Sequence, residues 1–296
     1  MFHSIYRFLS PKFQTIFLDY KVNSVPRYGH GKPPHALLYD IINTHRSEYA
    51  VILKKMLDYT DVFIKIPLTT TDPHAPMWHN SFLPALDIVG IYTMLNIYNP
   101  QKYIEVGSGN STKVAYKAIK ENNLRTRITS VDPYPRAEID ALSDEIIRQP
   151  LEDVGLWTMD IGKTTSNVQS PNSNVLNLEA GDILFIDNSH RVLPNSDAMV
   201  FFMEILPQLK PGVVVHIHDI YLPYDYPQFM CDRFYSEQYT LAAFILADPK
   251  RYKPILPNYF ISQDKELKSI LEPLWSHPNL KGVETHGGSF WMLIGE

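Results

Sequence analysis

The fold is decided by the stretch YIEVGSGNST, residues 103–112. Its first four residues form an apolar run that predicts a buried strand, and Ser111 opens a predicted helix that runs to about residue 121. Between them, Gly107 and Gly109 let a ligand approach the backbone closely, and the free N–H groups of a helix N-terminus favour an anionic ligand. The dinucleotide-binding fingerprint would place a third glycine at position 112, where this chain has threonine. An ordinary tight turn before a capped helix therefore stays open as the alternative.

A carboxylate ends the next predicted strand. The run ITSVD, residues 128–132, stops at Asp132, which lies 23 residues after Gly109. In nucleoside-binding α/β folds an acidic side chain at this position accepts hydrogen bonds from the ribose hydroxyls. A strand-end aspartate before a proline turn is the alternative. Taken with the glycine loop, the spacing favours a nucleoside ligand.

A further apolar strand also ends in polar residues. The run DILFIDNSH, residues 182–190, places Asp187 at the carboxyl end of the strand and His190 three residues later. Open α/β sheets bind their ligands at the carboxyl ends of the strands. We therefore expect both side chains to reach the same cleft, although His190 could also be a surface loop residue.

Two histidines lie on the following predicted strand. The run VVVHIHD, residues 213–219, puts His216 and His218 on one face and Asp219 at the tip. Buried polar groups need partners, so we expect His216 to be a satisfied core histidine. His218 lies closer to the edge of the strand, where it can reach the same cleft as Asp219.

Strands and helices alternate along the chain from about residue 80. This alternation implies βαβ units and a parallel sheet, which defines an α/β fold. Further helices are expected over 36–59, 83–98, 197–209, 238–247 and 265–274; further strands are expected at 146–147 and over 289–294; and a loop is expected over 164–177.

Composition excludes several classes of protein. Among 296 residues the formal net charge is −5 and no basic block occurs, which argues against a nucleic-acid partner and against binding to an anionic membrane surface. Cys231 is the single cysteine, so neither an internal disulfide nor a multi-cysteine zinc site can form. No apolar run approaches the ~20 residues that span a bilayer. We therefore expect a cytoplasmic protein.

The motifs resemble those of the class I S-adenosylmethionine-dependent methyltransferases, and most closely the small-molecule O-methyltransferase branch. That branch includes macrocin and cephalosporin-tailoring enzymes and, more distantly, catechol O-methyltransferase. The resemblance covers about residues 78–220, and GGSFW at 287–291 resembles the family's final strand. It implies a Rossmann-like, doubly wound, mostly parallel sheet with an antiparallel last strand. We therefore expect residues 76–296 to form the methyltransferase domain. Residues 1–75 do not match the family, and we expect them to form an N-terminal helical and irregular extension that covers the cleft or mediates homo-oligomer formation.

The resemblance also assigns residues to S-adenosylmethionine. Glu105, Gly107 and Gly109 would lie along the methionine part, and Asp132 would hold the ribose hydroxyls. The remaining expected cofactor contacts are Ser108, Ser111 and Asp187.

In the metal-dependent branch, an aspartate after the fourth strand and an acidic pair after the fifth bind Mg²⁺. Asp187 and Asp219 match two of these positions, whereas His218 stands where the relatives have an acidic residue. This donor set would suit another divalent metal at least as well as Mg²⁺. His190 resembles the general base of the sugar-modifying members, with Asp187 as its catalytic neighbour.

The resemblance implies methyl transfer to a hydroxyl of a small-molecule acceptor, such as a sugar or a secondary metabolite. Two other functions stay open. A nicotinamide-dependent oxidoreductase would use the same sheet but normally needs the third glycine. A non-catalytic S-adenosylmethionine-binding protein would keep the glycine loop without needing Asp187, His190 and Asp219.

Overall fold

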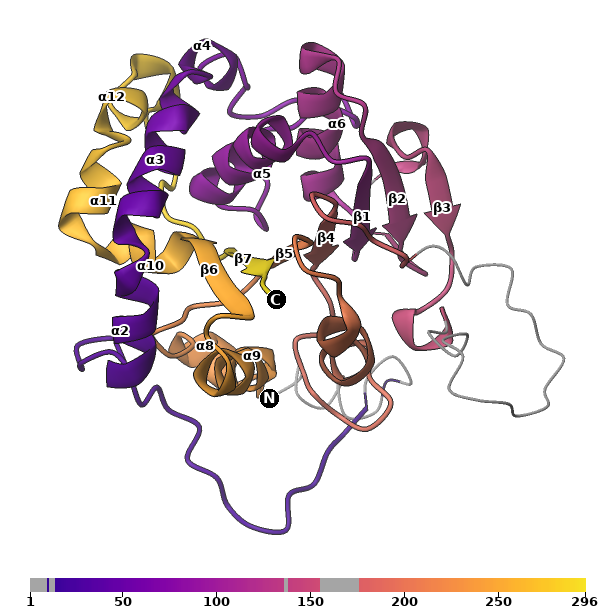
Figure 1. Ribbon diagram of the computed structural model, residues 1–296, viewed down its shortest axis with the longest axis vertical. Helices are drawn as coiled ribbons and strands as arrows, with labels where there is room; N and C mark the ends of the chain where they lie inside the picture. The colour runs from indigo at the N-terminus through magenta and orange to yellow at the C-terminus, as the bar shows by residue number, and fades with distance from the viewer. Residues whose placement is uncertain (1–9, 11–13, 136–137, 155–175) are drawn as a thin grey trace, which may run out of the picture.

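The computed structural model describes residues 10, 14–135, 138–154 and 176–296 (Figure 1). Most of the loop expected over 164–177 lies outside these residues. Within them, no helix combines the length and the apolar character needed to cross a membrane.

A seven-stranded sheet in the order β3-β2-β1-β4-β5-β7-β6 forms the centre of the molecule. The pairs from β3 to β5 are parallel, and β7 runs antiparallel to both β5 and β6. The expected doubly wound, mostly parallel sheet with an antiparallel last strand is therefore confirmed. The strands are β1 (Lys102–Val106), β2 (Arg127–Val131), β3 (Glu145–Ile147), β4 (Ile183–Ile186), β5 (Val214–Ile217), β6 (Tyr252–Pro257) and β7 (Phe290–Ile294).

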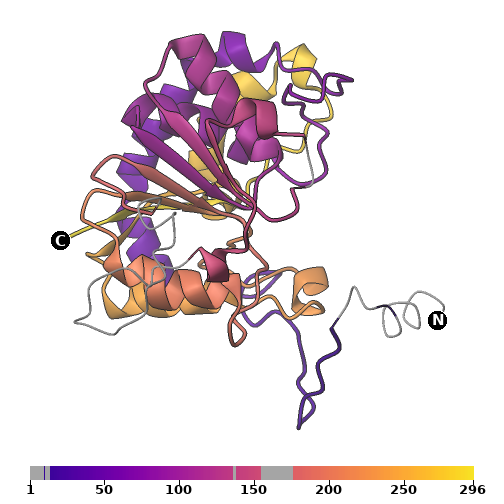
Figure 2. The same cartoon turned by 90° about the vertical axis from the view of Figure 1, so that its right-hand side faces the viewer.

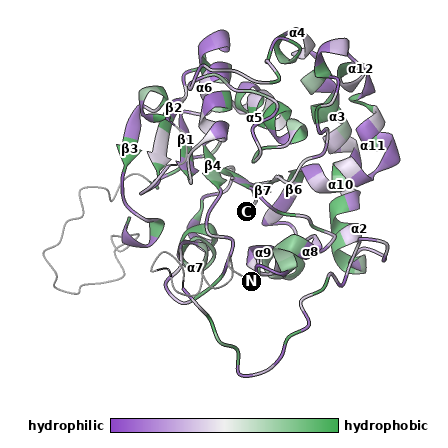
Figure 3. Ribbon diagram, turned by 180° about the vertical axis from the view of Figure 1, so that it is seen from behind, coloured by the Kyte–Doolittle hydropathy of each residue, from purple (hydrophilic) through white to green (hydrophobic). Residues whose placement is uncertain are grey.

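Helices cover both faces of this sheet. Figures 1 and 2 show α5 and α6 on one face and α8 and α9 on the other, and Figure 3 labels α7 on the same side as α8 and α9. In Figure 3 the hydrophobic colour follows α9, whereas α11 at the surface is largely hydrophilic. The helices are α2 (Ala36–Thr44), α3 (Arg46–Leu57), α4 (Thr60–Phe63), α5 (Ala85–Tyr98), α6 (Asn110–Asn122), α7 (Asp197–Val200), α8 (Gln228–Cys231), α9 (Glu237–Ala247), α10 (Asn258–Gln263), α11 (Lys265–Ser269) and α12 (Glu272–Trp275).

The two helices nearest the glycine loop begin and end at residues suited to those positions. α5 starts after Pro84 and stops at Asn99, whose left-handed backbone (φ 40°) ends the helix. α6 starts after Gly109, whose N–H donates to Thr112 Oγ1, and stops at Asn123 (φ 50°). Asparagine tolerates the left-handed region better than most residues do.

The expectation of one helix over 36–59 is wrong at His45. There the backbone leaves helical geometry (φ −95°, ψ 14°), and the chain divides into α2 and α3. The break lets the two halves pack on different neighbours, because α2 contacts α9 whereas α3 contacts α5 and β6. Large apolar residues of this region, among them Tyr49, Leu53 and Phe63, belong to the same buried cluster as the sheet.

Two other expected helices are also interrupted. Over 197–209 only Asp197–Val200 is α-helical, and a π turn (Phe201–Ile205) and a 3₁₀ turn (Leu206–Gln208) follow. Over 265–274 the chain forms α11 and α12 instead of one helix.

Backbones approach each other closely where β1 and β4 end. Asp187 N–H donates to Val106 O over 2.8 Å, and Gly107 has φ +82°. A Cβ at Gly107 would lie 2.0 Å from the Asp187 carbonyl oxygen, so no larger residue fits without moving one of the two strands.

This contact predicts an unequal cost for two alanine substitutions. Gly282 has φ +87°, but a Cβ added there would meet no atom within 4 Å, so Gly282→Ala should cost only the left-handed strain of about 1–2 kcal/mol. Gly107→Ala should cost about 1–3 kcal/mol more because of the steric overlap. Urea unfolding of both variants measures the difference, and equal costs would contradict the close approach.

Candidate active site

Two cavities open at the carboxyl ends of the parallel strands. The first, of about 480 Å³, extends from the glycine loop to Asp132, Tyr134 and Leu151 on one side and to His190 on the other. The second, of about 310 Å³, lies between the start of α6, Phe82 and His218. Both cavities are lined by Ser108 and Asp187, so they meet at the ends of β1 and β4.

Asp132 fastens the glycine loop to the end of β2. Its Oδ2 accepts a hydrogen bond from Ser108 N–H over 2.9 Å, and its Oδ1 accepts one from Tyr134 N–H over 2.8 Å. Each carboxylate oxygen has a second lone pair that remains available to a ligand in the first cavity. Asp132 therefore lies beside the first cavity and also holds the glycine loop, a role that the sequence did not indicate.

Glu105 is fully buried behind the loop and lines neither cavity. Thr112 Oγ1 donates to one of its oxygens, and Tyr103 OH lies 3.5 Å from the other. Because Thr112 Oγ1 also accepts from Gly109 N–H, a chain of hydrogen bonds joins Glu105 to the turn. Burial raises the pKa of Glu105 to about 8.

The other expected cofactor residues do line the cavities. Gly107 and Ser108 face the first cavity, and Ser108, Gly109 and Ser111 face the second. A Cβ at Gly109 would meet no atom within 4 Å, so glycine keeps this part of the second cavity open.

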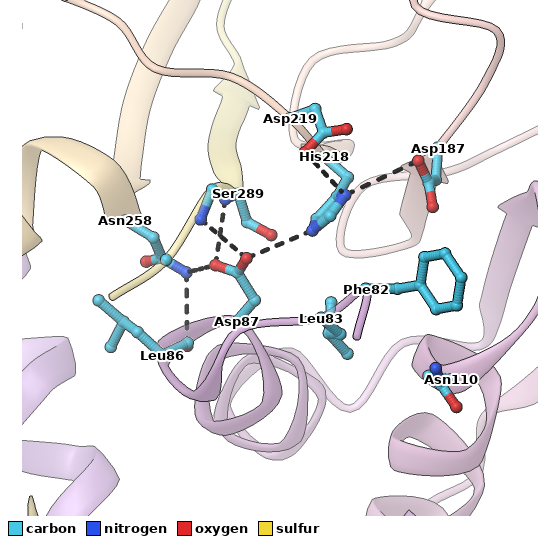
Figure 4. A network of polar contacts seen from close by, with 12 residues as sticks. Phe82, Leu83, Leu86, Asp87, Asn110, Asp187, His218, Asp219, Asn258 and Ser289 are labelled. Carbon is cyan, nitrogen blue, oxygen red and sulfur yellow. Dashed lines mark hydrogen bonds and ion pairs between the residues drawn. The ribbon is translucent and has the colours of Figure 1, made fainter. Parts of the chain in front are cut away.

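Asp187, His218 and Asp219 come together beyond β4 and β5 (Figure 4). One ligand atom from each lies within 4.8 Å of the others, which is a spacing suited to a metal ion. His218 Nδ1 lies 3.7 Å from Asp187 Oδ1 and 3.6 Å from Asp219 Oδ1. Asp219 has a left-handed backbone (φ 56°). Such strained backbone conformations are common at functional sites.

His190 faces the same two carboxylates from the other side. Its Nε2 lies 3.6 Å from Asp187 Oδ1 and 3.5 Å from Asp219 Oδ2, and its Nδ1 donates to Glu237 Oε1 over 2.7 Å. The ring stacks on Tyr235 with 4.5 Å between centroids. The His190 ring is therefore held by Glu237 at Nδ1 and by Tyr235 on one face.

The surroundings shift the pKa values of both His190 and Glu237. Burial alone lowers the pKa of His190, but the carboxylates of Glu237, Asp219 and Asp187 outweigh it and raise the pKa to about 9. Burial raises the pKa of Glu237 to about 6, although the neighbouring imidazolium opposes that shift.

Asp87 faces His218 from behind, as Glu237 faces His190. Its Oδ2 lies 3.4 Å from His218 Nε2, and the carboxylate is buried on α5. Burial lowers the pKa of His218, but Asp219, Asp187 and Asp87 together raise it well above its usual value. Sequence reasoning missed both Asp87 and Glu237. The one signal for Asp87 was an acidic residue inside the apolar run over 83–98.

His216 is a core residue, as expected, although its Nδ1 has no hydrogen-bond partner among the described residues. It is fully buried, its Nε2 is 2.6 Å from Ser289 Oγ, and its ring stacks on Trp291. Burial lowers its pKa well below the usual value, so the ring is neutral. It takes no part in the cluster around Asp187.

Comparison with known proteins agrees with the motifs. Residues 104–220 match a family described as "Methyltransferase domain". Over these residues the chain therefore resembles a methyltransferase domain, and its motifs resemble those of the class I S-adenosylmethionine-dependent methyltransferases, as the sequence predicted. A search of curated proteins gave no significant match.

The solved structures that match this chain include two methyltransferases. PaMTH1 of Podospora anserina, bound to SAH, is 13% identical with a TM-score of 0.39, and the alignment covers 83% of this chain and 88% of that one. Coclaurine N-methyltransferase, bound to N-methylheliamine and SAH, is 10% identical with a TM-score of 0.33, and the alignment covers 88% of this chain and 94% of that one.

The buried Glu105 predicts how stability depends on pH. Its pKa is raised from 4.5 to about 8 in the folded protein, so between these values the folded protein retains a proton that the unfolded chain has released. Stability from this group is therefore complete below about pH 4.5 and is lost as the pH rises through about 8, at up to ~1.4 kcal/mol per pH unit.

Glu105→Gln should remove this component, because an amide keeps the acceptor for Thr112 and does not ionise. Urea unfolding across pH 5–8 should show a flatter profile for Glu105→Gln than for the wild type. Glu284→Gln, at an exposed position, is the control and should keep the wild-type slope. Parallel profiles for all three proteins would contradict the raised pKa.

Proposed function

We propose that this protein transfers a methyl group from S-adenosylmethionine to a hydroxyl of a small molecule, such as a sugar or a secondary metabolite. The observation that carries the proposal is the meeting of the two cavities at Ser108 and Asp187. The first cavity has the glycine loop, the strand-end carboxylate of a nucleoside site and the imidazole of His190, and the adjoining cavity opens beside Asp187 and His218.

The residues around the first cavity suit the cofactor. S-adenosylmethionine, when bound, supplies the methyl group. Asp132 would accept hydrogen bonds from its ribose hydroxyls while still holding Ser108 N–H. Gly107 and Gly109 would let the methionine part approach the backbone closely. Glu105 would act from behind by fixing the loop, because it lines neither cavity.

His190 is the best-placed base. A glutamate on Nδ1 fixes the orientation of the ring and keeps that proton in place, which leaves Nε2 to face the cluster. Because methyl transfer to oxygen requires alignment and the removal of one proton, a positioned imidazole supplies much of what the reaction needs. The ring must be neutral to accept that proton.

Asp187, His218 and Asp219 would hold a divalent cation. Their ligand atoms lie close enough together to share one ion, and the set mixes carboxylate oxygen with imidazole nitrogen. Such an ion, when bound, would lower the pKa of the acceptor hydroxyl and offset the negative charge that keeps His190 protonated.

Two other functions are distinguishable by binding experiments. A nicotinamide-dependent oxidoreductase would give the cluster around Asp187 no role, and a response to NAD or NADP without one to S-adenosylmethionine would overturn the proposal. Binding of S-adenosylmethionine without a methylated product from any hydroxylated acceptor would indicate a non-catalytic binding protein instead.

Asp132→Ala should weaken S-adenosylmethionine binding by at least about tenfold, because hydrogen bonds to a charged group are each worth about 1.5–3 kcal/mol. Calorimetric titration measures the affinity. Asp182→Ala is a matched control, since Asp182 also accepts backbone N–H groups, from Gln101 and Lys102, but at the other end of β1. It should leave the affinity unchanged. Unchanged affinity in Asp132→Ala would remove the ribose assignment.

His190→Ala should lower turnover by about 10²–10⁴-fold while leaving S-adenosylmethionine affinity within about twofold, as expected for loss of a general base. Glu237→Gln should also lower turnover, because an amide can no longer hold the Nδ1 proton in the same way. Product formation in a screen of sugars and phenols, followed by mass spectrometry, gives the rates. Full activity in His190→Ala would dismiss it as the base.

A further inference from the structure

We propose that Asp87 positions His218 as a nitrogen ligand, so that the cation site prefers a transition-metal ion to Mg²⁺. The inference rests on the cation site proposed above and concerns the identity of the ion. It assigns a role to a buried carboxylate that neither the glycine loop nor the proposed base uses.

Asp87 is held rigidly by groups from distant parts of the chain (Figure 4). Its Oδ1 accepts hydrogen bonds from Asn258 Nδ2 over 2.8 Å and from Ser289 N–H over 3.0 Å. Its Oδ2 accepts one from Gly288 N–H over 2.8 Å. Next to these donors, a Cβ at Gly287 would lie 2.6 Å from Oδ1, so glycine leaves the carboxylate the room it needs. A fully buried carboxylate with three donors cannot turn away from its fourth neighbour.

That fourth neighbour is His218 Nε2, which lies 3.4 Å from Asp87 Oδ2, at ion-pair rather than hydrogen-bond distance. An ionised carboxylate has no proton to donate, so the contact favours the tautomer of His218 that carries its proton on Nε2. A cation that displaces the proton on the opposite nitrogen, Nδ1, would then meet a lone pair directed toward Asp187 and Asp219. A carboxylate behind a metal-binding imidazole is a common way to fix the ring and raise its basicity.

The distances from His218 Nδ1 to the two carboxylates are too long for hydrogen bonds, but they fit ligand atoms that bind the same metal ion. Nδ1 lies 3.7 Å from Asp187 Oδ1 and 3.6 Å from Asp219 Oδ1, beyond ordinary hydrogen-bond length. Two donors each about 2.1 Å from one tetrahedral ion would be ~3.4 Å apart. His218 is 5% exposed, so water cannot surround the ring. The three side chains thus form a small preformed set of one nitrogen and two oxygens.

This donor set discriminates between metals. Mg²⁺ binds oxygen ligands in near-octahedral geometry and gives up its water reluctantly, so it gains little from an imidazole. Co²⁺ and Zn²⁺ bind imidazole and carboxylate well, and they tolerate fewer ligands. The nitrogen from His218 should therefore shift the preference of the site toward these ions.

The test uses the chelator-treated full-length protein without S-adenosylmethionine. Calorimetry measures the affinities for Co²⁺ and Mg²⁺, and the visible absorption of bound Co²⁺ reports a nitrogen ligand. We expect the wild type to bind Co²⁺ at least about tenfold more tightly than Mg²⁺. Asp87→Asn should weaken Co²⁺ binding about 10–100-fold and change the absorption spectrum, as expected for loss of a residue that orients a ligand. His218→Ala should remove most of the preference for Co²⁺.

Asn258→Ala is the matched control, because it removes one donor to Asp87 but leaves the carboxylate facing His218. It should lower stability while keeping the wild-type Co²⁺ spectrum and an affinity within about threefold. Equal metal affinities in Asp87→Asn and Asn258→Ala would overturn the positioning role. If Asp87→Asn does not fold, His218→Ala tests whether His218 is a metal ligand. A ratio of Co²⁺ to Mg²⁺ affinity that is unchanged in His218→Ala would overturn the proposal.

A separate titration with S-adenosylmethionine shows which of the two proposals fails, the methyltransferase function or the nitrogen ligand. A protein that prefers Co²⁺ but does not bind S-adenosylmethionine would contradict the proposed function and support the nitrogen ligand. A protein that binds S-adenosylmethionine but holds Mg²⁺ more tightly than Co²⁺ would contradict the nitrogen ligand alone.

Discussion

The close approach of Gly107 to the backbone of Asp187 determines how the site is built. Val106 and Ile186 are paired neighbours in β1 and β4, so both strands end at the same level of the sheet. Only a residue without a Cβ allows the turn after β1 to lie against the residue that follows β4. The two cavities meet because of this contact, and the proposed transfer of a methyl group across that junction depends on it.

Two imidazole–carboxylate pairs face Asp187 and Asp219, and they differ in how the buried carboxylate is held. Asp87 accepts three hydrogen bonds from Asn258, Gly288 and Ser289 in addition to its contact with His218. Glu237 has one oxygen on His190, and its other oxygen has no hydrogen-bond partner among the described residues. Glu237 holds His190 through a direct hydrogen bond of 2.7 Å, whereas Asp87 faces His218 Nε2 at 3.4 Å. The first ring is therefore fixed by a hydrogen bond, and the second by an ion-pair contact with a rigidly held carboxylate.

The sequence predicted the strands and the residues that follow them, because both depend on local patterns of apolar and polar residues. Apolar runs located β1, β2, β4, β5 and β7, and the residues after them gathered at one edge because parallel strands share their carboxyl ends. β6 escaped prediction because Pro254 and Pro257 interrupt its pattern, but β6 is an edge strand, where a missing N–H is tolerated. Asp87 and Glu237 could not be assigned from spacing, since their roles come from contacts with residues far away in the chain.

The segment that matches the methyltransferase family does not include all of these groups. The matched segment, residues 104–220, contains Asp132 and every residue proposed to meet the acceptor or the cation directly. The carboxylates behind the two histidines come from outside it, on α5 and α9, and the donors that hold Asp87 come from α10 and the approach to β7. In this chain, helices outside the matched segment therefore hold the carboxylates that face the two histidines. In our proposal, the identity of the metal and the behaviour of the base are set by residues that touch neither cofactor nor acceptor.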